Sequence, residues 1–276
     1  MTFPIGKSAA LAVGFAVLGA GPLAADVTIS TASSSPAGEV RSTASIKGLK
    51  MREDSRVTGG IAAQFGAGSF QNTRIVKLDE RETINISSFD GKALVQGKDY
   101  YDNAAKVGAR ADQPKVHIQA SGKTRQVAGQ SCDVHQIEAS IPLSNIMPAD
   151  LAKLPGLQLD GAVMTMRGTA CLAAGAPGWE DYRTFYAAAT DFYRRAPSPD
   201  GPATMLIGAI AEKGVMYEMT MKGELEGGNG GAIPLLSQIV ASFADMSMQV
   251  TAISTDKVPP SLFEIPAGTP IARISY

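Results

Sequence analysis

The sequence contains few of the side chains that usually carry catalysis or metal chemistry. Its 276 residues include two histidines and two cysteines. The sequence patterns of phosphate loops, dinucleotide sites, zinc proteases and EF-hands are absent. There are 25 Lys and Arg against 26 Asp and Glu, a net charge of −1, and the basic residues form no block. This balance argues against nucleic acid as a partner, and we expect no cofactor.

The two histidines do not form a catalytic group. His117 alternates with polar residues and is expected to face water, whereas His135 shares the apolar face of its strand. Asp133 lies two residues before His135 on that face, but no third group accompanies them. Ser131, in "GQSCD", lacks the second glycine of a nucleophile elbow. We therefore expect a protein without enzymatic activity.

The longest apolar stretch lies within the first 25 residues. Lys7 precedes the run Ala9–Ala20, a Gly-Pro pair follows it, and Ala25 suits the position before a signal-peptidase cut. At about 12 residues the run is too short to span a bilayer, and no later stretch is long and apolar enough. We predict a signal peptide over residues 1–25 and an exported mature chain from Asp26, with no membrane span.

Alternation of apolar and polar residues dominates the rest of the chain. In "RETINISSF", Ile84 and Ile86 share one face of a strand, and in "KVHIQAS" Val116 and Ile118 do the same. Turn residues separate several such segments, as in "FDGK" (89–92) and "SGKT" (121–124). Short consecutive strands with short links favour an antiparallel sheet. Strands are predicted near 27–33, 39–47, 49–57, 73–79, 82–89, 92–99, 114–121, 131–141, 161–171, 214–223 and 244–255.

One segment has helical periodicity instead. "GWEDYRTFYAAATDFYRRA" places six residues on one helical face: Trp179, Tyr182, Phe185, Tyr186, Ala189 and Tyr193. Arg194 and Arg195 fall in the last turn, where cations complement the helix dipole. Further helices are expected within 202–212 and 232–242, and a loop over 142–156. No repeat or domain boundary is evident, so residues 26–276 are predicted to form one mainly β domain.

Methionines occur three times in the pattern Met-x-Met. Because alternate residues of a strand point to one side, the two members of each pair share a strand face: Met164 and Met166, Met219 and Met221, Met246 and Met248. Flexible thioethers can fill an irregular core or line an adaptable surface for an apolar ligand. They also bind Cu(I), which is a soft ion. Copper is the least favoured interpretation, because the pairs lie apart on separate strands.

The two cysteines are predicted to form a disulfide. Cys132 lies early in one predicted strand and Cys171 at the end of another, so antiparallel pairing of the two strands would bring the sulfurs together. Exported proteins fold in an oxidising compartment, where cysteines usually pair. The closed loop of about 40 residues would contribute roughly 3–4 kcal/mol. The alternative, a reactive thiol, lacks a C-x-x-C motif and a neighbouring cation at Cys132.

Four segments carry a resemblance to a known family. "IKGLKMRED", "IVKLDE", "VAGQSCDVHQIEAS" and the closing "STDKVPPSLFEIPAGT" resemble exported bacterial proteins of unknown function, which are related in pattern to the LolA/LolB-like lipoprotein carriers of the periplasm. The resemblance implies a strongly curved antiparallel sheet, an open half-barrel, with helices over its concave apolar side. In the carriers that side holds acyl chains, and the helix near 179–195 would act as a lid. The cysteine pair departs from the carrier pattern.

We therefore expect a periplasmic protein that binds or carries an apolar ligand, such as a lipid or an acyl chain. Six methionines and three helix side chains form the candidate wall of the cavity: Met164, Met166, Met219, Met221, Met246, Met248, Trp179, Tyr182 and Tyr186. The first alternative is an envelope assembly or interaction module with a packed core, no ligand and an unidentified protein partner. Copper binding through the Met-x-Met triplets is the second.

Overall fold

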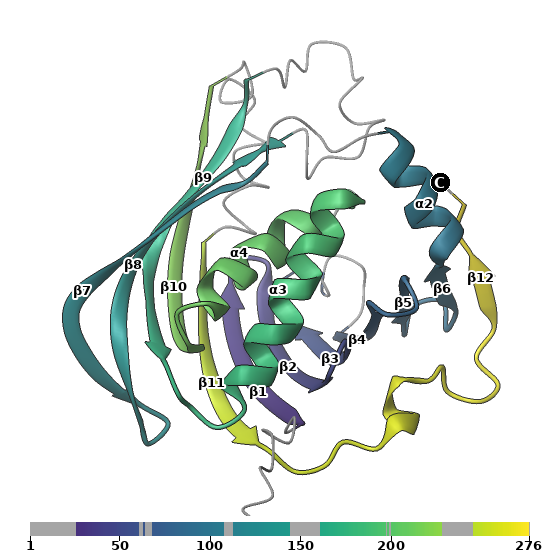
Figure 1. Cartoon of the computed structure of the whole chain (residues 1–276), viewed down its shortest axis with the longest axis horizontal. Helices are drawn as coiled ribbons and strands as arrows, with labels where there is room; N and C mark the ends of the chain where they lie inside the picture. The colour runs from purple at the N-terminus through teal and green to yellow at the C-terminus, as the bar shows by residue number, and fades with distance from the viewer. Residues whose placement is uncertain are drawn as a thin grey trace, which may run out of the picture.

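The fold is that of the computed structural model, which describes residues 26–60, 63, 68–107, 113–143, 161–196, 198, 200–227 and 245–275. These residues are mainly β and form one twelve-stranded sheet. The sheet is strongly curved and not closed, and helices lie inside its curve (Figure 1). The predicted fold class, an open and largely antiparallel half-barrel covered by helices, is confirmed.

The sheet consists of two meanders that meet where β1 pairs with β11. Its order is β12-β6-β5-β4-β3-β2-β1-β11-β10-β9-β8-β7, and all neighbours are antiparallel except β12 and β6. The strands are β1 (Val27–Ser35), β2 (Gly38–Lys47), β3 (Lys50–Thr58), β4 (Ser69–Lys77), β5 (Glu82–Ser87), β6 (Ala93–Gln96), β7 (Lys115–Val127), β8 (Gln130–Pro142), β9 (Val163–Ala173), β10 (Val215–Glu226), β11 (Met246–Ser254) and β12 (Ile271–Arg273).

Three β-bulges interrupt the ladders. They lie in β11 at Thr251, opposite Ser30 and Thr31 of β1, in β7 after Ala120, and in β10 at Tyr217. A bulge bends its strand and increases the local right-handed twist. Their positions in the half of the sheet that contains β7–β11 therefore favour the strong curvature seen in Figure 1.

Helices α3 (Trp179–Arg195) and α4 (Gly201–Ala211) pack against the concave face of the sheet (Figure 1). The apolar face predicted for α3 is buried, including Phe185 and Tyr193. It packs on residues of β1, β2 and β3 such as Ile46, and together they make the aromatic cluster. Pro202 lies in the first turn of α4, where its missing N–H costs nothing. None of the described helices is long and apolar enough to cross a membrane.

A C-terminal segment covers the opposite face of the first meander. We call residues 255–270, between β11 and β12, the strap. Its Val258 and Phe263 pack on Ile75 and Ile84, whereas the next residue of β4, Val76, belongs to the aromatic cluster on the concave side. The strap contains the short helix η4 (Pro260–Phe263) and leads to β12. The first meander is therefore covered on both faces.

All eleven predicted strands have a counterpart, with corrections at three places. The strand expected over 92–99 ends at Gln96, and α2 (Lys98–Val107) follows it; α2 and β12 were missed. The turn expected at 121–124 is wrong, because β7 continues to Val127: Gly122 adopts φ +72 within the bulge and the hairpin turns at Ala128 and Gly129. The predicted helix 232–242, nearly all of the loop 142–156 and the signal peptide 1–25 lie outside the described residues.

Candidate functional site

The six methionines of the candidate wall gather in one place. Met164, Met166, Met219 and Met221 are buried in one cluster, and the half-buried Met246 and Met248 pack against it. Leu206 and Ile210 of α4 belong to the same cluster, which places it on the concave face. We call this group, with its strand neighbours, the methionine cluster.

Strand register explains how so many long side chains fit together. Met219 lies opposite Met248, and Met221 lies opposite Met246. On the other side β9 offers small residues: Ala170 is paired with Met219, and Gly168 with Met221. A Cβ on Gly168 would lie 2.8 Å from Met221 Sδ, so this thioether lies over the glycine. Small residues therefore leave the room into which the methionines fold.

The three helix residues of the candidate wall belong to the neighbouring aromatic cluster. Tyr182 and Tyr186 are buried with ring centroids 4.8 Å apart, and the Tyr186 hydroxyl donates to Met51 Sδ at 3.7 Å. Burial raises the pKa of both phenols above their ordinary value. The half-buried Trp179 donates its indole N–H to the Ala211 carbonyl at 2.8 Å. The nine predicted residues thus form two adjoining groups.

A hollow of about 510 Å³ lies between α3, α4 and the start of β7. Its lining includes none of the nine candidate residues; it consists of Gln113, Pro114, Val116, Ala187, Ala188, Thr190, Asp191, Arg194, Met205, Gly208, Ala209 and Glu212. Val116 packs against the methionine cluster and Met205 against the aromatic cluster, so the hollow opens where the two meet. Thr190 Oγ1 is buried there and has no hydrogen-bond partner among the described residues.

A buried polar network, which the sequence analysis missed, fixes the end of α3 to the sheet. The Tyr101 hydroxyl donates to Thr83 Oγ1 at 2.8 Å, and Arg74 donates to the Tyr193 hydroxyl at 3.1 Å and pairs with Asp200 at 3.2 Å. Burial raises the pKa of Tyr101. Burial alone would lower the pKa of Arg74, but Tyr193 and Asp200 raise it. The Arg74 guanidinium therefore stays charged although it is buried.

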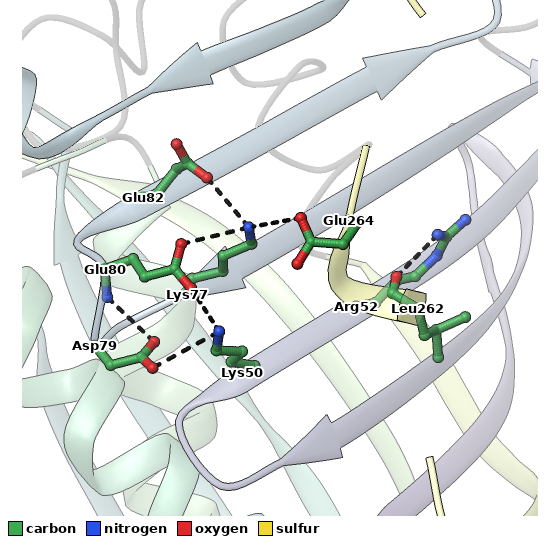
Figure 2. A network of polar contacts seen from close by, with 8 residues as sticks. All are labelled: Lys50, Arg52, Lys77, Asp79, Glu80, Glu82, Leu262 and Glu264. Atoms are coloured by element: carbon green, nitrogen blue, oxygen red, sulfur yellow. Dashed lines mark hydrogen bonds and ion pairs between the residues drawn. The ribbon is translucent and has the colours of Figure 1, made fainter. Parts of the chain in front are cut away.

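Figure 2 shows a second network, which holds the strap on the sheet. The Lys77 ammonium is 7% exposed and lies 3.5 Å from carboxylate oxygens of Glu80, Glu82 and Glu264. Burial lowers its pKa, but the three carboxylates outweigh burial and raise it. Arg52 donates to the Leu262 carbonyl at 3.0 Å. Glu264 and Leu262 belong to the strap, so charge pairing adds to its apolar contacts.

The predicted disulfide is confirmed. Cys132 and Cys171 are joined, with Cα atoms 5.3 Å apart, across the antiparallel pair β8–β9. Strand alternation turns the two cysteines away from Met166 and Met164, and both are buried in the aromatic cluster. Arg125 and Glu218, from β7 and β10, form an ion pair at 2.5 Å. This is a structural link and not a reactive thiol.

The residues considered for catalysis do not form a site. His117 is exposed, and His135 is half-buried with Nδ1 3.0 Å from the Asp133 carbonyl oxygen. Among the residues that the structure describes, no three His, Cys, Asp or Glu side chains are grouped to hold a metal ion. This statement does not cover thioether ligands, which methionines supply.

Comparison with known proteins identifies no family to which this chain belongs. No family model matches the sequence, and no curated protein matches it. Two solved structures of PNGF-II, in space groups C2 and P21, share 9% and 7% identity with this chain at TM-scores of 0.33 and 0.32. The matches cover 91% and 92% of this chain, which spans 31% and 32% of the PNGF-II chain. Similarity of this size assigns neither family nor function.

Proposed function

We propose that this protein is an exported, periplasmic carrier or binding protein for an apolar ligand such as a lipid or an acyl chain. The hollow between α3, α4 and β7 would admit the ligand, and the methionine cluster behind it would adapt to it. The observation that carries the proposal is the position of this hollow at the junction of two apolar clusters, one of them rich in methionine. The resemblance to LolA/LolB-like carriers suggests the same role.

Binding would follow from burial of apolar ligand surface. A volume of about 510 Å³ lies within the usual range for small-molecule sites, roughly 300–1,000 Å³. Each Å² of apolar surface removed from water contributes about 25 cal/mol, before the loss of ligand freedom is subtracted. Unbranched thioethers change rotamer at little cost, so the methionine cluster can reshape around a chain. The rim carries both signs of charge, Asp191 and Glu212 beside Arg194, and selects no single headgroup charge.

The test is native mass spectrometry of protein purified from its own envelope, before and after solvent extraction. The proposal predicts a polypeptide that starts at Asp26, accompanied by a releasable adduct of lipid mass. A bare polypeptide in every preparation would contradict it.

A pair of phenylalanine variants tests the location. Ala187 is exposed on α3 and lines the hollow, so Ala187→Phe should fill it without disturbing the core. Ala252→Phe adds the same ring at an exposed position of β11 outside the lining. The adduct should decrease at least several-fold in Ala187→Phe and persist in Ala252→Phe. Equal retention in both variants would place the ligand elsewhere.

One observation favours the interaction module as a second candidate. β7 forms one end of the sheet order and is 13 residues long and mostly exposed, and no described strand pairs with its outer edge. An open edge of this length can pair with another chain. Its bulge after Ala120 and the charges of Lys115, Lys123 and Arg125 oppose indiscriminate pairing. Sedimentation of the purified chain over a concentration series would reveal self-association through this edge.

A further inference from the structure

The pairing of β10 with β11 sets two of the three Met-x-Met triplets side by side. Met219 is opposite Met248 and Met221 is opposite Met246, with Thr220 opposite Ser247 between them. The four methionines therefore share one face as a two-by-two array. Directly opposed residues of antiparallel strands have Cβ atoms about 4.5–5.5 Å apart, which is within reach of long side chains. Four thioether sulfurs can converge above this patch of the sheet.

The third triplet has a different position. Met166 is paired with Gly223 and Met164 with Leu225, so these two lie in the next rows along β10 and have no methionine opposite. Both are buried, whereas Met246 and Met248 are half-buried and keep part of the array accessible. The array of four is thus distinct from the rest of the methionine cluster.

The chemistry of the array suits a soft monovalent metal ion. Thioethers are neutral soft donors, and they favour Cu(I) over hard ions, which take carboxylate and water. A cation in an apolar cluster needs a compensating charge. Asp245 directly precedes Met246, and its carboxylate accepts a hydrogen bond from the Gly223 N–H at 2.9 Å. An anion is therefore held at the end of the array nearest to Met221 and Met246.

We propose that Met219, Met221, Met246 and Met248 form a binding site for one soft monovalent ion of the Cu(I) or Ag(I) class. The proposal does not rest on the apolar-ligand role, although it uses four side chains of the methionine cluster, because it requires only the β10–β11 face. No thiol competes for the ion, since both cysteines are in the disulfide. Flexible thioethers that now pack against Ala170 and Gly168 would turn their sulfurs toward the ion.

The experiment titrates the mature chain with Ag(I), because silver is redox-inert and leaves the disulfide intact. The buffer contains no chloride, which would precipitate the silver. Native mass spectrometry should show one silver ion per chain. Methyl NMR of labelled methionine should show shifts of the signals of these four residues. Absence of a one-to-one complex, or shifts confined to other methionines, would overturn the proposal.

Two double variants locate the site. Leucine has nearly the volume of methionine, so both variants should fold. Met219→Leu with Met248→Leu removes an opposed pair and should weaken silver binding at least ten-fold. Met164→Leu with Met166→Leu is the matched control from the same cluster, and it should bind as the wild type does. Equal binding by the two variants would refute the assignment. If the first variant fails to fold, the single change of the half-buried Met248 to Leu gives the same comparison.

Discussion

Removing one ring of the strap tests how far the strap stabilises the whole sheet. Phe263 is 1% exposed and packs in a separate cluster with Ile75, Ile84 and Val95 on the face away from the helices. Replacing a buried phenylalanine by alanine usually costs about 3–5 kcal/mol, since it removes apolar burial and leaves a cavity. The strap can partly collapse onto the gap, so we expect Phe263→Ala to cost about 3 kcal/mol.

Urea and thermal unfolding of the purified mature chain measure this cost. A loss of about 3 kcal/mol should lower the melting temperature by about 6–12 °C in a domain of this size. Phe89→Ala is the matched control: the ring is 55% exposed, although its centroid lies 5.0 Å from that of Phe70. It should cost below about 1 kcal/mol. Equal costs for the two variants, or none for Phe263→Ala, would refute a stabilising role for the strap.

Three further changes have defined outcomes. Replacing Cys132 and Cys171 by alanine should cost roughly 3–4 kcal/mol in urea unfolding, because the bridge closes a loop with a sequence separation of 39; a loss below about 1 kcal/mol would contradict this. A hydrogen bond from Lys50 lowers the pKa of Glu80, so the folded state gains stability above the unfolded pKa and loses it as pH falls below about 4. Glu80→Gln should reduce the loss of unfolding free energy at acid pH, and an unchanged pH dependence would count against the pairing. Tyr193→Phe deprives the buried Arg74 of an acceptor and should cost about 1–3 kcal/mol by the same unfolding assay, where full stability would disprove the network.

Much of the sheet could be predicted, because burial leaves a local trace in the sequence. Ile84 and Ile86 alternate in sequence with residues of the opposite face, and the apolar spacing from Tyr182 to Tyr193 follows a helix over three turns. Cys132 and Cys171 come at the matching ends of two consecutive strands, so their pairing also followed from local order. These signals need only the periodicity of single elements and the order of strands that are neighbours along the chain.

The missed features depend on partners far along the chain. Tyr101 and Ala104 stand three apart in α2 and are buried, a helical signal that the neighbouring strand pattern concealed. β12 has three residues and exists because it pairs with β6. The methionine triplets revealed their shared faces, but not that Met219 lies opposite Met248, because register is fixed by the whole ladder.

The joint between the two meanders has a consequence for the order of folding. Asp26 accepts hydrogen bonds from Lys47 at 2.9 Å and from the Val258 N–H at 2.6 Å, a contact between residues 232 positions apart. β1 and β11, at the centre of the sheet, are likewise brought together from distant parts of the chain. Closing so long a loop is entropically costly before its contacts form, so such topologies fold slowly. Apart from β12, each meander consists of strands that are neighbours along the chain, whereas the junction between the meanders needs β11 and the strap. Until those residues are available, β1 has no partner on its outer side and the two meanders are not joined into one sheet.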